Sequence, residues 1–300
     1  MVEAKPHISV CICTYKRPML LGRLLEELGR QETDGQFTYS IVVAENDESQ
    51  SARTVVSEFA ARSDIAVKYC VQPRRSIALT RNAAVENASG EFIAFIDDDE
   101  FPTERWLLTL LRACNKHEVD GVLGPVMPYF EENTPKWVVK GGFYDRPRHP
   151  TGLRLVSSQT RTGNVLMERR SFEEGERFNP EFLAASDQEF FGRMIAKGCI
   201  FSWCNEATVY EVVPPERCRP SFLIRRAVFR GAFSRRLARS SLTPFVLSLI
   251  AAPAYAAALP LTLVSGQAQF MKYVFKLCYH MGRLLALLGI NPVKEPYVTQ

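Results

Sequence analysis

The sequence predicts an α/β fold in which helices flank a mostly parallel sheet, with a hydrophobic helical region at the C-terminal end. Short apolar runs alternate with segments of helical periodicity over about the first 130 residues, which is the pattern of parallel strands joined by crossover helices. The run Phe92 to Ile96 is apolar without a break. Such a run is typical of a strand that is buried on both faces of a parallel sheet.

Strands and helices can be assigned in order up to residue 96. Pro18 suits the first turn of a helix, and leucines at helical spacing give that helix an apolar face. Ser49 or Ser51 is expected to cap the next helix. The expected strands are 8–13, 39–44, 65–71 and 92–96, and the expected helices are 18–30, a second one ending at 59, and 74–88.

After residue 96 the pattern continues with longer connections. Thr103 is placed to cap a helix that runs to about Lys116, and strands are expected at 120–126 and 163–167. Residues 128–160 are rich in Pro, Gly and charged residues, which predicts a long functional loop or flap. The tetrapeptide Ser186–Glu189 has the form of a capping box, so we expect a helix to begin there and to end at Gly198.

Three adjacent carboxylates, Asp97, Asp98 and Asp99, follow the apolar strand. Like charges this close repel one another and are costly to desolvate, so a partner should offset them. At the carboxyl end of a strand in an open α/β sheet that partner is usually a ligand or a cation. Aspartates one residue apart suit a divalent ion whose other ligands are nucleotide phosphates. A solvated acidic turn is the alternative interpretation.

The last third of the chain combines basic and apolar segments. From Val212 onward there are twelve Lys or Arg residues and only two acidic ones, and this local excess favours an anionic membrane surface over nucleic acid as a partner. The stretch Phe245 to Val264 carries no charge and is long enough to cross a bilayer core, although Pro253 and Pro260 oppose a straight helix. A soluble helical hairpin or a dimer interface is the alternative. We therefore expect a catalytic domain over residues 1–240 and a membrane-associating helical region over residues 241–300.

The eight cysteines show no zinc-ligand spacing. Cys11 and Cys13 alternate within a strand, and Cys199, Cys204 and Cys278 lie among apolar residues, which predicts free thiols in a reducing compartment. The first residues contain no apolar signal region. Both observations favour a cytoplasmic location.

The chain carries, in this order, the segments Thr14–Arg17, Glu45–Asp47, Ala78–Asn82, Asp97–Asp99, Gly163–Asn164 and Ser186–Asp187. Together these segments resemble the motifs of the family 2 inverting glycosyltransferases, whose fold is the GT-A nucleotide-diphospho-sugar transferase fold. Within that family the chain is most similar to the succinoglycan-type bacterial exopolysaccharide glucosyltransferases. The resemblance spans about residues 7–240. It implies a transferase that moves a hexose, with glucose favoured, from a UDP-sugar to a saccharide acceptor.

The resemblance also implies roles for particular residues in donor binding. The loop after the first strand would line the uracil pocket, an acid after the second strand would accept the uracil N3–H, and the carboxylate triplet would hold Mg²⁺ or Mn²⁺ against the diphosphate. The residues implied for nucleotide-sugar binding are Thr14, Tyr15, Arg17, Glu45, Asp47, Arg81, Asp97, Asp98 and Asn164, and those implied for the metal are Asp97 and Asp99.

Asp187 stands where the family has its catalytic base. On the residues alone a structural role is the simpler interpretation, because an acid in the first turn of a helix is favoured by the macrodipole. As a base, Asp187 would take the proton of the acceptor hydroxyl, and a single displacement would convert a UDP-α-sugar into a β-linkage. Possible phosphate or metal contacts implied further along the chain are Glu211, Arg225, Arg226 and Arg230.

The substrate class that the family resemblance implies is an acceptor sugar carried on a polyprenyl diphosphate. Such an acceptor agrees with a location at the cytoplasmic face of the cell membrane. Two rival functions remain open. A sugar-phosphate nucleotidyltransferase would have a Gly-rich basic loop directly after the first strand, where this chain has Thr14 to Pro18. A non-catalytic membrane scaffold built on a degenerate transferase fold is the other.

Overall fold

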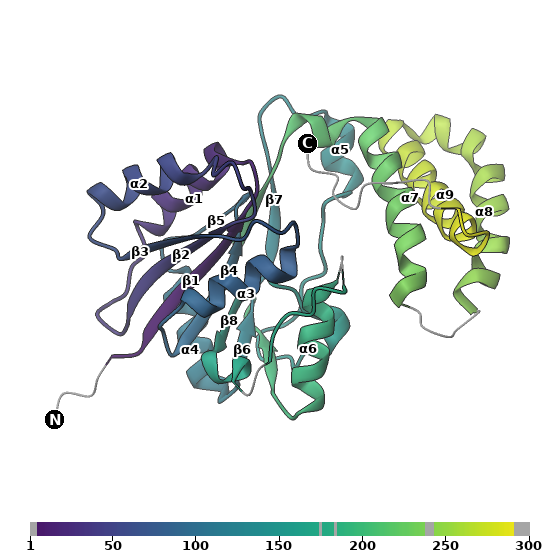
Figure 1. Ribbon diagram of the computed structural model, residues 1–300. Coiled ribbons are helices and arrows are strands. Elements are labelled where there is room, and N and C mark those ends of the chain that lie inside the picture. Colours follow the sequence, from purple (N-terminus) through teal and green to yellow (C-terminus); the bar gives the residue numbers. More distant parts are fainter. Residues whose placement is uncertain (1–4, 174–175, 183–184, 238–242, 291–300) are drawn as a thin grey trace. The chain divides into compact units, whose positions relative to one another are not determined.

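The computed structural model describes residues 5–173, 176–182, 185–237 and 243–290 (Figure 1). The chain divides into two compact units. Unit 1 comprises Met1–Pro128 and Arg146–Val212, and unit 2 comprises Tyr129–Asp145 and Val213–Gln300. This division differs from the domain boundary expected at residue 240, because the helix that precedes that boundary packs against the last helix of the chain.

Unit 1 is built on a seven-stranded sheet with the order β3-β2-β1-β4-β8-β6-β9. Only β8 runs antiparallel to its neighbours β4 and β6, so the prediction of a mostly parallel sheet is confirmed. The strands are β1 (His7–Thr14), β2 (Thr38–Glu45), β3 (Val67–Val71), β4 (Phe92–Asp97), β6 (Gly121–Leu123), β8 (Asn164–Glu168) and β9 (Phe201–Trp203).

Helices cover both faces of this sheet, and each face has its own apolar core (Figure 1). The alternation of side chains along β1 shows how the strand supplies both cores: Val10 and Ile12 belong to one, and Cys11 belongs to the other. One face is covered by α1 (Pro18–Leu28), α2 (Arg53–Arg62) and α4 (Trp106–His117), and the other by α3 (Ile77–Asn87) and α6 (Ser186–Ala196). Each fully buried leucine or phenylalanine in these cores contributes about 1.5–3 kcal/mol to folding.

A second, three-stranded sheet has the order β5-β10-β7, with β5 at Glu100–Pro102, β10 at Val209–Val213 and β7 at Val126–Phe130. β5 begins three residues after the end of β4, so this small sheet starts directly beside the acidic triplet. The single strand expected at 120–126 is instead divided into β6 and β7. The break falls at Gly124 and Pro125, where a side chain on Gly124 would meet the carbonyl oxygen of Ala207 at 2.2 Å.

One expected helix start and one expected helix cap are wrong in this part of unit 1. The helix expected at Arg74 begins at Ile77, where the Ser76 hydroxyl accepts a hydrogen bond from the Leu79 amide. No side chain caps α4, so Thr103 does not cap that helix.

Residues 128–160, expected as a long loop, contain the end of β7, helix α5 (Lys136–Gly141) and the short 3₁₀ helix η1 (Ser157–Gln159). Another 3₁₀ helix, η2 (Arg169–Phe172), follows β8.

Unit 2 is helical, and its longest helix, α9, packs against α5, α7 and α8. Its elements are α5, η3 (Pro215–Cys218), α7 (Pro220–Leu237), α8 (Thr243–Thr262), η4 (Leu263–Ser265) and α9 (Gln267–Leu287). Two glycines allow α7 and α9 to touch along their backbones. A Cβ on Gly231 would lie 1.9 Å from the Tyr279 carbonyl oxygen, and one on Gly282 would lie 2.1 Å from that of Val228.

Helix α8 continues through Pro253 and Pro260. The stretch Phe245–Ser265 has a mean hydropathy of 1.8 and is 17% buried. Within the described part of the chain it is the one helical stretch whose length and composition would allow it to cross a membrane. Length and composition alone do not distinguish a membrane-spanning helix from an apolar helix that lies on a surface.

Candidate active site

The acidic triplet lies where β1 and β4 end side by side, since Cys13 is paired with Asp97 in the parallel register. The Thr14 hydroxyl donates a hydrogen bond to Asp98 Oδ2 at 2.8 Å. The Arg17 guanidinium, at the start of α1, reaches Asp98 Oδ1 at 3.0 Å and Asp99 Oδ2 at 3.1 Å. The structure thus brings together the loop after the first strand and the triplet, two segments more than 80 residues apart.

Burial raises the pKa of Asp97 and that of Asp98 to about 6. The charge of Arg81 offsets part of this effect at Asp97, and that of Arg17 does so at Asp98, while Asp99 adds to it at both. Burial, followed by the charge of Asp97, also raises the pKa of Glu100 well above its usual range. Burial and mutual repulsion therefore make the ionised forms of these carboxylates costly, and a bound cation would offset that cost.

These carboxylates fit a divalent cation. Oxygen ligands of this kind are the ones that Mg²⁺ and Mn²⁺ prefer. Glu100 Oε1 is buried and has no hydrogen-bond partner among the described residues. A Cβ placed on Gly163 would meet Glu100 Oε1 at 2.7 Å and Asp97 Oδ2 at 3.2 Å, so the absent side chain leaves room beside both oxygens. The described residues hold no group of three His, Cys, Asp or Glu side chains around one metal position. Phosphate oxygens would have to complete the coordination.

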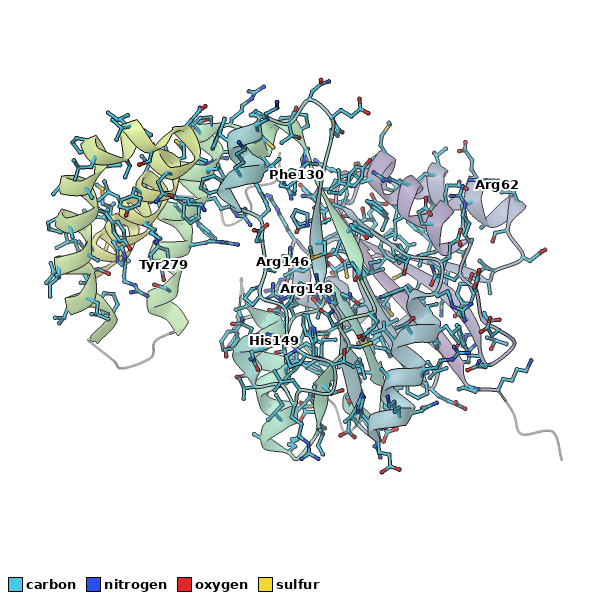
Figure 2. All side chains as sticks on the ribbon, turned by 180° about the vertical axis from the view of Figure 1, so that it is seen from behind. Arg62, Phe130, Arg146, Arg148, His149 and Tyr279 are labelled. Carbon is cyan, nitrogen blue, oxygen red and sulfur yellow. The ribbon has the colours of Figure 1, made fainter. Side chains whose placement is uncertain are left out.

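A further acid on the small sheet, together with an arginine from outside that sheet, joins the cluster. Glu211 on β10 is paired with Glu100 on β5, and its carboxylate forms an ion pair with Arg146, which is labelled in Figure 2. Burial lowers the pKa of Arg146, but Glu211 and Glu100 outweigh it, so that the net change is upward. Glu211 was expected in the site. Arg146 was missed, because a single arginine in a loop-rich segment has no recognisable pattern.

Helix α6 presents Asp187 at its first turn. The cap residue is Ala185, whose φ of 60° is left-handed, and no side chain caps the helix. The expected capping box is therefore wrong, and Ser186 is already the first helical residue. Its hydroxyl instead accepts a hydrogen bond from Arg81 at 3.2 Å. Asp187 Oδ1 accepts from the Gln188 amide at 2.9 Å, and the residue is partly exposed, so the carboxylate can be approached from solvent.

Glu45 is fully buried and is engaged within the protein. One carboxylate oxygen accepts hydrogen bonds from the Ser51 hydroxyl and the Ala52 amide, each at 2.9 Å, and the other accepts from the Tyr69 hydroxyl. Glu45 thereby accepts the hydrogen bond of a backbone amide at the start of α2. The expected cap by Ser49 or Ser51 is wrong, because no side chain of the cap residue forms such a bond. Asp47 has a different setting, because its hydrogen bonds come from Ser49 and hold its pKa below the usual range.

Asn164 has no exposed surface. Its side-chain oxygen accepts from Trp106 Nε1 at 2.9 Å, and its nitrogen donates to the carbonyls of Pro125 at 3.0 Å and Ala207 at 2.7 Å. With these partners the side chain anchors the start of β8. Asn164 thereby positions Gly163 beside Asp97, and its contact with the donor stays a prediction.

The Tyr15 ring lies beside two cationic side chains, with Lys16 Nζ at 5.4 Å and the Arg75 guanidinium at 5.1 Å from its centroid. Lys16 has a φ of 54°, which turns the chain sharply between the end of β1 and α1. An aromatic ring with flanking cations suits a planar base next to phosphates.

The remaining predicted contacts lie in unit 2, on α7. Arg225 and Arg230 are exposed, and the Arg226 guanidinium lies 4.6 Å from the centroid of the Tyr144 ring. Their part in the site stays a prediction.

Comparisons with known proteins agree with this picture. The sequence model described as Glycosyl transferase family 2 matches residues 9–175. The succinoglycan biosynthesis protein ExoM of Rhizobium meliloti (strain 1021) is 28% identical over 300 residues, which cover 96% of this chain and 95% of the relative.

Two solved structures show the fold. The mannosyltransferase PcManGT from Pyrobaculum calidifontis, in complex with GDP-Man and Mn²⁺, is similar with a TM-score of 0.65 and 16% identity over 96% of this chain and 89% of its own. The S. aureus TarS 1–349 complex with UDP-GlcNAc has a TM-score of 0.56 and 15% identity over 94% and 92%. Both support the expected GT-A fold. Because the family model covers more than half of the residues, the chain belongs to glycosyltransferase family 2.

Proposed function

We propose that this glycosyltransferase moves a hexose, with glucose favoured, from a UDP-sugar to a saccharide acceptor in polysaccharide biosynthesis, with inversion at the anomeric carbon. One observation carries the proposal. Unit 1 contains both a buried acidic cluster at the end of β4 and the accessible Asp187 at the start of α6. The likeness to ExoM supports polysaccharide synthesis, and the UDP-GlcNAc complex of TarS supports a UDP-sugar donor.

The donor is expected to bind with its base beside Tyr15 and its phosphates beside the triplet. Asp47 takes the role of the uracil N3–H acceptor, because Glu45 has no exposed surface whereas Asp47 is 6% exposed and so remains accessible to a ligand. Mg²⁺ or Mn²⁺ held by Asp97 and Asp99 would neutralise the charge that builds on the leaving diphosphate. Asp98 is oriented by Thr14 and Arg17 to contact the nucleotide.

Asp187 acts as the general base. Its carboxylate accepts the proton of the acceptor hydroxyl as that oxygen attacks the anomeric carbon. The amide of Gln188 holds one carboxylate oxygen, which leaves the other for the acceptor. Arg81 reaches Ser186 and so fixes the start of α6 relative to α3. A single displacement of this kind yields a β-linkage from a UDP-α-sugar.

The acceptor is proposed to be a sugar on a polyprenyl diphosphate, presented at the cytoplasmic face of the cell membrane. Helix α8 supports this proposal, because Leu249, Ile250 and Leu261 expose 60%, 67% and 75% of their surface. Leucine and isoleucine exposed in series are costly in water and favourable at a lipid interface. The basic residues around the apolar stretch would be attracted to anionic headgroups by about 1 kcal/mol each.

The test of the donor and metal assignment is turnover of a panel of UDP-sugars with Mn²⁺, Mg²⁺ or EDTA. We expect EDTA to abolish transfer reversibly. Asp99→Asn should abolish transfer while the thermal unfolding transition is kept, and Asp64→Asn, an exposed acid of the same unit, should be normal. Undiminished transfer in EDTA or by Asp99→Asn would remove the metal site. Hydrolysis of the UDP-sugar without acceptor already distinguishes an enzyme from a scaffold.

The base is tested by Asp187→Asn. The amide keeps the size of the side chain but does not accept a proton, so we expect UDP-sugar binding to persist while kcat falls roughly a hundredfold or more. Near-normal turnover would leave Asp187 with a structural role only. NMR of the product gives a second check, since retention of the anomeric configuration contradicts a single displacement.

A further inference from the structure

Arg161 lies in an extended segment that leads into β8. Its neighbours Thr160 and Thr162 are each 1% exposed and anchor the segment in unit 1. Gly163 follows, and its Cα lies against the carboxylates of Glu100 and Asp97. Arg161 is therefore two residues from a backbone position that touches the acidic cluster.

The same segment is packed against α6. The Gln188 side chain reaches the Ser158 carbonyl at 3.5 Å, and a Cβ on Gly192 would contact the Ser157 side chain at 3.5 Å. This packing joins the segment of Arg161 to the helix that carries Asp187, and Gly163 joins the same segment to Glu100 and Asp97. Burial lowers the pKa of Arg161, the neighbouring Arg146 lowers it further, and the charges of Asp187, Glu100 and Glu211 oppose the change.

The other arginines of the site have protein partners for their guanidinium groups, whereas Arg161 has none among the described residues. Arg17 pairs with Asp98 and Asp99, Arg146 pairs with Glu211, and Arg81 donates to Ser186. Across the parts of the chain that the structure describes, no hydrogen bond or ion pair within 4.0 Å joins Arg161 to another residue. A partly buried guanidinium has five donors to satisfy, and leaving them unmade is costly unless water or a ligand supplies the acceptors.

The geometry points to Arg161 as a residue that binds the β-phosphate of the nucleotide-sugar donor, the leaving group of the reaction. This inference rests on the proposed function. The anomeric C–O bond to the β-phosphate breaks and its electron pair stays on the phosphate oxygen, while the acceptor oxygen forms the new bond and its proton goes to Asp187. Charge grows on the β-phosphate during this step. A planar guanidinium can bind two of the phosphate oxygens at once.

The inference is tested by calorimetric titration of UDP and of UMP, each with Mn²⁺, into wild type and variants. Arg161→Gln should weaken UDP binding about tenfold or more and change UMP binding less than twofold, because UMP lacks the β-phosphate. Arg161→Lys keeps the charge and should recover part of the UDP affinity. Arg148→Gln is the matched control, since Arg148 is an exposed arginine of the same unit whose Nε donates to Asn205 (Figure 2).

Unchanged UDP affinity in Arg161→Gln overturns the inference, and so does an equal loss for UDP and UMP. A loss confined to the KM of the acceptor also overturns it, and would assign Arg161 to the acceptor side. These outcomes are separate from failure of the proposed function, which would show as a wild-type protein that binds neither UDP nor a UDP-sugar. An unchanged unfolding transition in Arg161→Gln confirms that the comparison is between folded proteins.

Discussion

Carboxylates of this chain differ in pKa according to their surroundings. Asp47 is held in the ionised form by hydrogen bonds from Ser49, whereas Glu100 is buried beside Asp97 and favours the protonated form. Hydrogen bonds to a carboxylate lower its pKa, while burial and like charges raise it. The surroundings of each carboxylate therefore decide which of its two protonation states is favoured.

The pKa of Glu100 leads to a prediction on stability. Because its folded-state pKa is raised, the folded protein binds a proton more tightly than the unfolded chain. Stability contributed by this group is therefore present at low pH and is lost as pH rises above the unfolded pKa. Glu100→Gln removes the titration and keeps an oxygen for the Asp97 amide. We expect the free energy of unfolding of the variant, relative to wild type, to increase between pH 5 and pH 8 in metal-free buffer.

Chemical denaturation at several pH values measures this difference. Glu58→Gln, an exposed acid on α2, is the control and should show no such trend. A difference between Glu100→Gln and wild type that stays constant with pH would mean that Glu100 is already ionised in the folded protein.

Sequence patterns located the triplet because three adjacent acids after an apolar strand are unusual. They did not locate Arg146 or Arg161, since an isolated arginine in an irregular segment carries no periodicity. The sequence patterns also did not decide whether Glu45 or Asp47 accepts the uracil N3–H. Only the hydrogen bonds from Ser51, Ala52 and Tyr69 show that Glu45 is already used inside the protein.

Strands and helices were largely predictable, but their ends were less so. The apolar runs and the leucine spacing depend on burial, which the linear sequence records directly. Caps depend on contacts that are distant in sequence or on backbone conformation. At the start of α2, the Ala52 amide donates its hydrogen bond to Glu45, seven residues earlier in the sequence. Helix α6 starts after an alanine in the left-handed conformation, which no sequence pattern would indicate.

The role of Glu45 at the start of α2 can be measured. Glu45→Ala removes the acceptor for three hydrogen bonds and leaves a buried cavity, so we expect a loss of about 3 kcal/mol in the free energy of unfolding. Tyr69→Phe removes only one of these bonds and should cost about 1 kcal/mol. UDP affinity, measured at a temperature where the variant is folded, should be nearly unchanged. A stable Glu45→Ala protein with lost UDP affinity would instead assign Glu45 to the uracil.

Charge and hydrophobicity are distributed unevenly over the whole molecule. Helix α8 turns Ser248 toward α9, where it contacts His280 at 3.0 Å, while Leu249 and Ile250 are exposed. The exposed apolar side chains of α8 support the proposal of membrane attachment. The sequence predicted this region from its length and lack of charge.

Membrane attachment is tested by placing charges on the exposed face of α8. Leu249→Glu with Ile250→Glu should shift the protein from the membrane fraction to the soluble fraction, because a carboxylate is costly at an apolar interface and is repelled by anionic lipid. UDP binding should be kept. Met19→Glu is the matched control, since Met19 on α1 is 86% exposed in unit 1. A wild-type chain that is soluble without detergent would make the face a packing or dimerisation surface.

The course of the chain between the two units limits how the protein can be taken apart. The polypeptide passes from one unit to the other after Pro128, Asp145 and Val212, and the short stretch 129–145 contributes Val138 and Tyr144 to the apolar core of unit 2. A recombinant fragment that begins at residue 213 would lack these side chains and should fail to fold. A single protease cut at any of the three passages leaves at least one unit made of both pieces. The nicked protein should therefore elute as one species from a native column and separate into two bands only under denaturing conditions.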